Sequence, residues 1–159
     1  MDFSRVTFGE AIAAGSGLAL FIVMFLPWFG VSEDPISESY NAWKAFGFTD
    51  ILLFVVIVIA IGQAVARAAD AMPQMNQPPG AFVAAAGGVA LLLIFFRLIS
   101  TPDVDVDALG QSVAADRKIG VLLGLFAAAG IAYGGYTSVD ERLDEEFEAT
   151  RVEGRPRRR

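Results

Sequence analysis

The sequence predicts an all-α membrane protein: a bundle of four transmembrane helices with a short interfacial helix in the first outer connection. The 159 residues are 55% hydrophobic, and their mean hydropathy of +0.53 is too high for a soluble chain of this length. Four apolar runs are each close to the ~20 residues that cross a bilayer as a helix. Charged residues, 19% of the total, gather in the lead, the connections and the tail, because charge inside lipid is costly.

Composition excludes several classes of chemistry. The chain has no cysteine, which excludes disulfides, thiolate nucleophiles and iron–sulfur ligation. It also has no histidine, which removes imidazole haem ligation and the usual zinc sites. The net charge of −6 comes from acids in the connections and tail, so nucleic acid is not an expected partner.

The first predicted span covers residues 9–29. Thr7 and Glu10 have the spacing of a capping box, which places the start of a helix near Phe8. Pro27 is expected to end or kink this helix. The run is longer than the apolar part of a signal peptide, and Pro27-Trp28-Phe29 stands where a small-residue cleavage site would be, which favours a retained span.

The first connection, residues 26–50, is rich in aromatic side chains. Tyr40, Trp43 and Phe46 recur every three residues, so Tyr40–Gly47 is expected to be a short helix in the membrane interface. Together with Trp28, these rings fit either an ordinary aromatic belt at headgroup level or a platform for a partner.

The second and third spans are predicted at residues 49–67 and 80–99. Asp50 stands at the start of the second span, and Gln63 is its one strongly polar side chain, which suits a hydrogen bond between helices. A proline-rich loop follows Arg67, and Arg97 lies in the last turn of the third span.

The connection before the fourth span contains Asp103, Asp105 and Asp107. This D-x-D-x-D run resembles the opening of an EF-hand loop, but Ala108 and Ala114 stand where glycine and a bidentate glutamate are needed. We therefore expect a solvated extended segment and no metal site.

The fourth span, predicted at residues 119–138, carries two stripes of small residues, which allow helix backbones to approach closely. Both packing inside the chain and packing against a second copy fit this pattern. The stripes consist of Gly120, Gly124, Ala128 and Ala132, and of Gly130 and Gly134.

Residues 140–159 are predicted to be a charged cytoplasmic tail, first acidic and then basic. Leu143 and Phe147 are four residues apart, so the fourth helix is expected to continue for a few turns into water. The terminal arginines fit contact with anionic headgroups, and they equally fit a disordered tail.

Basic residues indicate the orientation in the membrane. Four spans place both termini on one side, and positive charge favours the cytoplasm. Eight basic residues lie on the side of the termini, and four lie opposite. The eight are Arg5, Arg67, Arg142, Arg151, Arg155, Arg157, Arg158 and Arg159, and the four are Lys44, Arg97, Arg117 and Lys118. We expect a multi-pass protein of the cell membrane with both termini in the cytoplasm.

This topology predicts two charge pairs. Asp50 and Arg97 fall at the outer ends of the second and third spans, and Glu10 and Arg67 fall at the inner ends of the first and second. In the alternative arrangement, each of the four side chains reaches water separately.

The segments FLPWFG, NAWKAFGFTDILL and RKIGVLLGLFAAAGIAYGG, together with the late Arg97, resemble a group of small four-span membrane proteins of actinobacteria. The resemblance covers most of the chain except the tail. It implies the four-span fold but brings no activity, cofactor or catalytic residue.

These patterns favour a structural, accessory-subunit or interaction role over an enzyme. The expected partners are the lipid bilayer and either another membrane protein or further copies of this chain, with no cofactor and no metal. The alternative is a component of a small-solute transporter or channel. Its weakness is that no charged residue lies near the middle of any span, so a charged-ion pathway has no evident groups.

Overall fold

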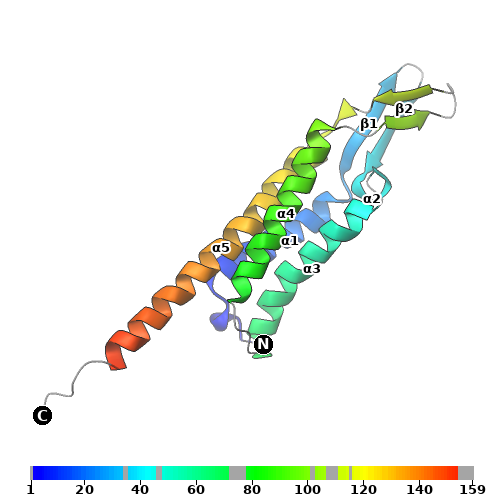
Figure 1. The fold of residues 1–159 in the computed structure, drawn as a ribbon. Helices are drawn as coiled ribbons and strands as arrows, with labels where there is room; N and C mark the ends of the chain where they lie inside the picture. The colour runs from blue at the N-terminus through cyan, green and yellow to red at the C-terminus, as the bar shows by residue number, and fades with distance from the viewer. Residues whose placement is uncertain are drawn as a thin grey trace, which may run out of the picture.

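The computed structural model describes residues 2–33, 36–45, 48–71, 78–100, 103–106, 111–114 and 116–153. Four long helices lie side by side, and a small β structure covers one end of them (Figure 1). The helices are η1 (Phe3–Arg5), α1 (Phe8–Val23), α2 (Ala42–Ala45), α3 (Phe48–Ala68), α4 (Pro79–Ile99) and α5 (Ile119–Glu153). The strands are β1 (Pro27–Glu33), β2 (Ile36–Asn41), β3 (Asp103–Val106), β4 (Gln111–Ala114) and β5 (Asp116–Arg117).

Within the part of the chain that the structure describes, three helices are long and apolar enough to cross a membrane: α3, α4 and the Ile119–Asp144 part of α5. The fourth, α1, is apolar but has only 16 residues. It ends at Val23, six residues before the predicted end of the first span, and the chain is extended from Pro27. Proline has no N–H to donate to a helical hydrogen bond, so the helix cannot continue through it.

The helices pack around α5, which lies against both α1 and α4, while α1 also packs against α3 and α3 against α4. Leu20, Leu53, Ile94 and Ile131 are fully or almost fully buried between them. Large apolar side chains also point outward along the same helices, among them Phe126, which is 75% exposed. Such a continuous apolar outer surface is typical of a protein that faces lipid.

The connection between α1 and α3 and the connection between α4 and α5 both form strands, which corrects the all-α prediction at this end of the molecule. Strands β1 and β2 form an antiparallel hairpin, and β5 pairs with the other edge of β1, opposing Phe29 to Arg117. Strands β3 and β4 form a second hairpin. The predicted extended segment at Asp103 and Asp105 is therefore confirmed as strand β3, while Asp107 lies outside the described residues.

The predicted interfacial helix Tyr40–Gly47 is mostly wrong. Tyr40 and Asn41 belong to β2, and among the described residues of this segment only the four of α2, Ala42–Ala45, are helical. Pairing with β1 satisfies the backbone groups that a helix would otherwise satisfy internally. Phe46 lies outside the described residues.

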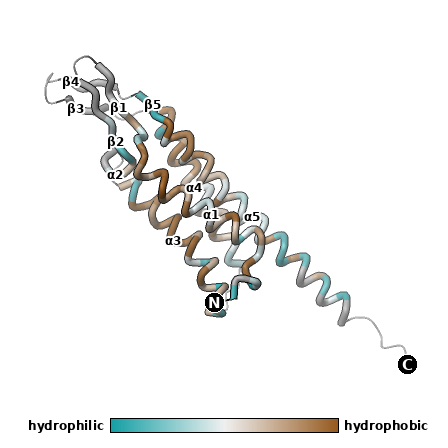
Figure 2. The backbone as a smooth tube through the Cα atoms, turned by 180° about the vertical axis from the view of Figure 1, so that it is seen from behind, coloured by the Kyte–Doolittle hydropathy of each residue, from teal (hydrophilic) through white to brown (hydrophobic). Residues whose placement is uncertain are grey.

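Helix α5 runs for 35 residues, to Glu153, which confirms that the fourth helix continues past its apolar part. Figure 2 shows that the hydrophilic turns of α5 project beyond the other helices, at the end of the bundle where the chain begins. We call residues 139–153 the stalk.

Candidate functional site

The most enclosed charged group in the described part of the chain is Glu10, in the first turn of α1. Thr7 caps this helix: its hydroxyl accepts from the Glu10 N–H at 3.3 Å, while Glu10 Oε2 accepts from the Thr7 N–H at 3.1 Å. The predicted capping box is therefore confirmed. It fixes the Glu10 carboxylate at the end of the bundle, with its side chain fully buried.

Glu10 joins α1 to two other helices. Its Oε1 accepts from Gln63 Nε2 at 3.1 Å and pairs with Arg67 Nη2 at 3.1 Å, both from α3. It also pairs with Arg142 Nη2 of α5 at 3.2 Å. The predicted Glu10–Arg67 pair and the predicted interhelical hydrogen bond of Gln63 are thus confirmed, whereas Arg142 was assigned to the tail and missed.

The positive charges of this Glu10 cluster compensate the buried carboxylate. Two guanidinium groups, 18% and 26% exposed, face one buried carboxylate. Enclosing a carboxylate without such partners would cost several kcal/mol. Gln63 Oε1 and Arg142 Nε have no hydrogen-bond partner. The cluster holds three helices together, and its carboxylate is committed to these contacts.

Trp28 lies at the opposite end of the helix bundle from Glu10. It is fully buried, and its Nε1 donates to the Val23 carbonyl at 2.7 Å. The indole lies on α5, where a Cβ at Gly120 or Gly124 would come within 2.6 or 2.5 Å of the ring. Trp28 is therefore a packed side chain of the bundle and does not belong to an interfacial belt.

The glycine stripes of α5 are used inside the chain. Gly130 packs against Ser16 of α1, and Gly134 packs against Gly9 and Ala13 of the same helix. With Trp28 on Gly120 and Gly124, all four glycines of the two stripes meet other parts of this protein. Intramolecular packing is therefore confirmed as a use of both stripes.

Asp50 lies at the Trp28 end of the bundle and is only 3% exposed. Arg97 acts electrostatically on its carboxylate, which agrees with the predicted proximity of the two residues. Asp50 Oδ1 has no hydrogen-bond partner.

Four aromatic rings meet where α1 and α3 approach the hairpin. Phe21 stacks edge to face with Phe25 at 5.3 Å between ring centroids, and Trp43, 37% exposed, lies 6.0 Å from Phe25 and 6.1 Å from Phe54. An apolar groove of about 420 Å³ continues between α1 and α3. Trp43 could be singled out from the sequence, but the phenylalanines could not, because uniformly apolar runs do not show which helix faces meet.

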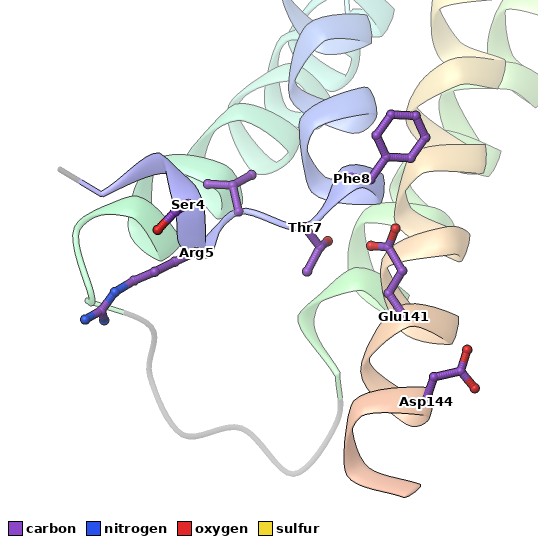
Figure 3. Close-up of a pocket in the computed structure, with 7 residues that line it drawn as sticks. Ser4, Arg5, Thr7, Phe8, Glu141 and Asp144 are labelled. Carbon is purple, nitrogen blue, oxygen red and sulfur yellow. The ribbon is translucent and has the colours of Figure 1, made fainter. Parts of the chain in front are cut away.

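A cleft of about 420 Å³ lies between the N-terminal lead and the base of the stalk (Figure 3). Glu141 points towards the start of α1, where its Oε2 accepts from the Gly9 N–H at 3.2 Å. Asp144 follows one turn later and also lines the cleft, as does Phe8, which is 73% exposed. Sequence analysis did not find this site, because its two walls are more than 130 residues apart.

The lead is held in place as a wall of this cleft. The Asp2 N–H donates to the Ala68 carbonyl at 2.8 Å, and Arg5 pairs with Asp70 at 2.6 Å. The hydroxyl and N–H of Ser4 both donate to the Asp2 carboxylate and hold its pKa below the ordinary value. Arg5 therefore has its charge partner outside the cleft.

Beyond the cleft, the stalk carries two large apolar side chains that are at least half exposed. Leu143 is 51% exposed and Phe147 is 80% exposed. Within the described residues, no group of three or more acidic side chains is arranged to hold a metal ion.

Comparison with protein-family models, curated proteins and solved structures finds no match to this chain.

Proposed function

We propose that this protein is a small multi-pass membrane protein with an interaction role, acting as an accessory or structural subunit that presents its stalk to a partner. One observation carries the proposal: α5 continues without a break from the bundle into a stalk on which Leu143 and Phe147 are exposed. A helix anchored in this way holds a contact surface at a fixed distance from the membrane.

The internal contacts of the bundle support this role. Glu10 ties α1, α3 and α5 at one end, and Trp28 locks β1 onto α5 at the other. These groups are used for holding helices together, as expected of a rigid support. The eight-to-four distribution of basic residues favours a cell-membrane orientation with both termini in the cytoplasm.

A component of a small-solute transporter or channel is a second candidate. It is favoured by the buried Asp50, whose Oδ1 lacks a hydrogen-bond partner, because buried ionisable groups in spans often mark substrate pathways. Solute flux through vesicles containing the purified protein, abolished by Asp50→Asn, would favour this role over the first.

The interaction role is tested in native membranes at the natural expression level. After gentle extraction, we expect the wild-type chain to migrate in a complex with a stoichiometric partner. Phe147→Ala should release that partner, because it removes the most exposed apolar side chain of the stalk. Phe126→Ala is the matched control, since Phe126 is similarly exposed on the same helix but within its apolar part. A wild-type chain that is always a lone monomer would refute the role.

A further inference from the structure

We infer that the stalk and the cleft at its base bind a basic amphipathic helix of a partner protein. The apolar side chains of that helix would cover Leu143 and Phe147, and one lysine or arginine would enter the cleft beside Asp144. The inference rests on the proposed interaction role and specifies the chemistry of the partner.

The apolar part of the surface is formed by Leu143 and Phe147. Residues four apart lie on the same face of a helix, and both side chains are at least half exposed. At 1.5 Å per residue, Phe147 stands about 14 Å along the helix from Ser138, which is still fully buried in the bundle. Phe147 thus lies beyond the packed helices, and its 80% exposure agrees with this position.

The acidic charge of the stalk indicates which kind of partner this surface would bind. The stalk contains seven acidic residues and two arginines, and one of these, Arg142, is already paired with Glu10. An anionic lipid surface would repel such a helix, and a second copy of the stalk would bring acidic residues against acidic residues. A basic partner complements it. The acidic residues are Asp140, Glu141, Asp144, Glu145, Glu146, Glu148 and Glu153, and the other arginine is Arg151.

The cleft supplies a place for one basic side chain. Asp144 lines it and is three residues from Phe147, so the carboxylate and the ring occupy neighbouring positions on the helix. Phe8, exposed on the opposite wall, offers an apolar surface for the stem of a lysine or arginine. Arg5 is the one basic side chain among the described residues that line the cleft, and it is paired with Asp70, so it does not repel an incoming cation strongly.

This combination fits the binding mode in which an amphipathic helix lays its apolar face against a complementary surface. The apolar contacts would supply most of the affinity. The acidic side chains would select against acidic partners and speed the encounter with basic ones.

The experiment uses the full chain in nanodiscs of zwitterionic lipid. The probe is a fluorescently labelled synthetic helix of leucine and lysine, and its counterpart carries glutamate in place of lysine. Empty nanodiscs correct for binding to lipid. We expect saturable 1:1 binding of the lysine peptide that weakens as salt is raised, and no binding of the glutamate peptide.

Single substitutions test which side chains of the protein contact the lysine peptide. Phe147→Ala should weaken binding about tenfold or more, since burying a phenylalanine contributes roughly 1.5 kcal/mol or more. Phe126→Ala should leave it unchanged. Asp144→Asn should weaken binding about threefold and reduce its salt dependence. Circular dichroism of each variant in the nanodisc checks that the helices are retained.

Three results of this binding experiment would overturn the inference: equal binding of both peptides, equal effects of the two phenylalanine variants, or peptide binding that appears only after deletion of residues 154–159. In the last case, the arginine-rich end of the chain itself would be the occupant. A native complex that depends on Phe147 but not on Asp144 would likewise refute the basic partner while leaving the interaction role intact.

Discussion

Glu10 shows how one side chain can serve both local and tertiary structure. As the third residue of α1 it completes the capping box with Thr7, and the same carboxylate receives Gln63, Arg67 and Arg142. The pair with Arg67 could be predicted, because both residues stand at the same end of adjacent spans. Arg142 could not, since its 132-residue separation from Glu10 gives no local signal.

Replacing Glu10 by glutamine should destabilise the protein by about 3 kcal/mol, because two guanidinium groups would lose their shared carboxylate. The measurement is the unfolding midpoint of the purified protein in detergent. Asp70→Asn is the control: it breaks the Arg5–Asp70 pair, in which both side chains are at least half exposed, and should cost less than 1 kcal/mol. Similar losses of stability in the two variants would show that Glu10 stabilises the bundle no more than an exposed ion pair does.

Asp50→Ala should lower the unfolding midpoint in detergent more than Glu33→Ala does. Asp50 is buried and faces the charge of Arg97, so its removal takes away a favourable interaction in a poorly solvated place. Glu33 ends β1 in the outer connection. Equal shifts would argue against the Asp50–Arg97 interaction.

At the scale of elements, the sequence predicted best the helices that depend on length and apolarity alone. The bounds of α3 and α4 fall within two residues of the predicted spans. The hairpins were missed, because a strand such as β1 is stabilised by β5, almost ninety residues later. The spacing of Tyr40, Trp43 and Phe46 instead indicated a helix, and tertiary pairing overrode that local pattern.

Helix packing at the Trp28 end can be tested by filling one glycine. Gly124→Ala should destabilise the protein by about 1–3 kcal/mol, since the new Cβ would overlap the buried indole. Gly88→Ala is the matched control in α4, because a Cβ there meets nothing within 4 Å. The measurement is the unfolding midpoint of each variant. A Gly124→Ala variant as stable as the wild type would show that Trp28 does not pack against α5 as described.

At the scale of the whole molecule, the chain forms a bundle with two different ends. One end is a β-rich cap, and the other holds η1 and the stalk (Figures 1 and 2). The cleft lies between the N-terminal lead and the base of the stalk (Figure 3). The four-helix arrangement could be predicted from the apolar runs. The cleft could not, because it forms only when the first residues of the chain meet the second half of α5.

Single cysteines test this arrangement, since the chain has none of its own. In sealed membrane vesicles, an impermeant maleimide should label Ser4→Cys and Thr150→Cys from the same side. Ser39→Cys, in the hairpin, should be labelled only from the opposite side. The bundle requires this pattern because its four helices run alternately up and down. Labelling of Ser4→Cys and Thr150→Cys from opposite sides would exclude it.

The burial of Trp28 has an optical consequence. The chain contains only two tryptophans: Trp28 is sealed against α5, and Trp43 is partly exposed. A Trp43→Phe variant would therefore emit from a single indole in a dry environment. Its emission maximum should shift to longer wavelength only when β1 separates from α5, so the protein carries its own spectroscopic probe of the capped end, independent of events at the stalk.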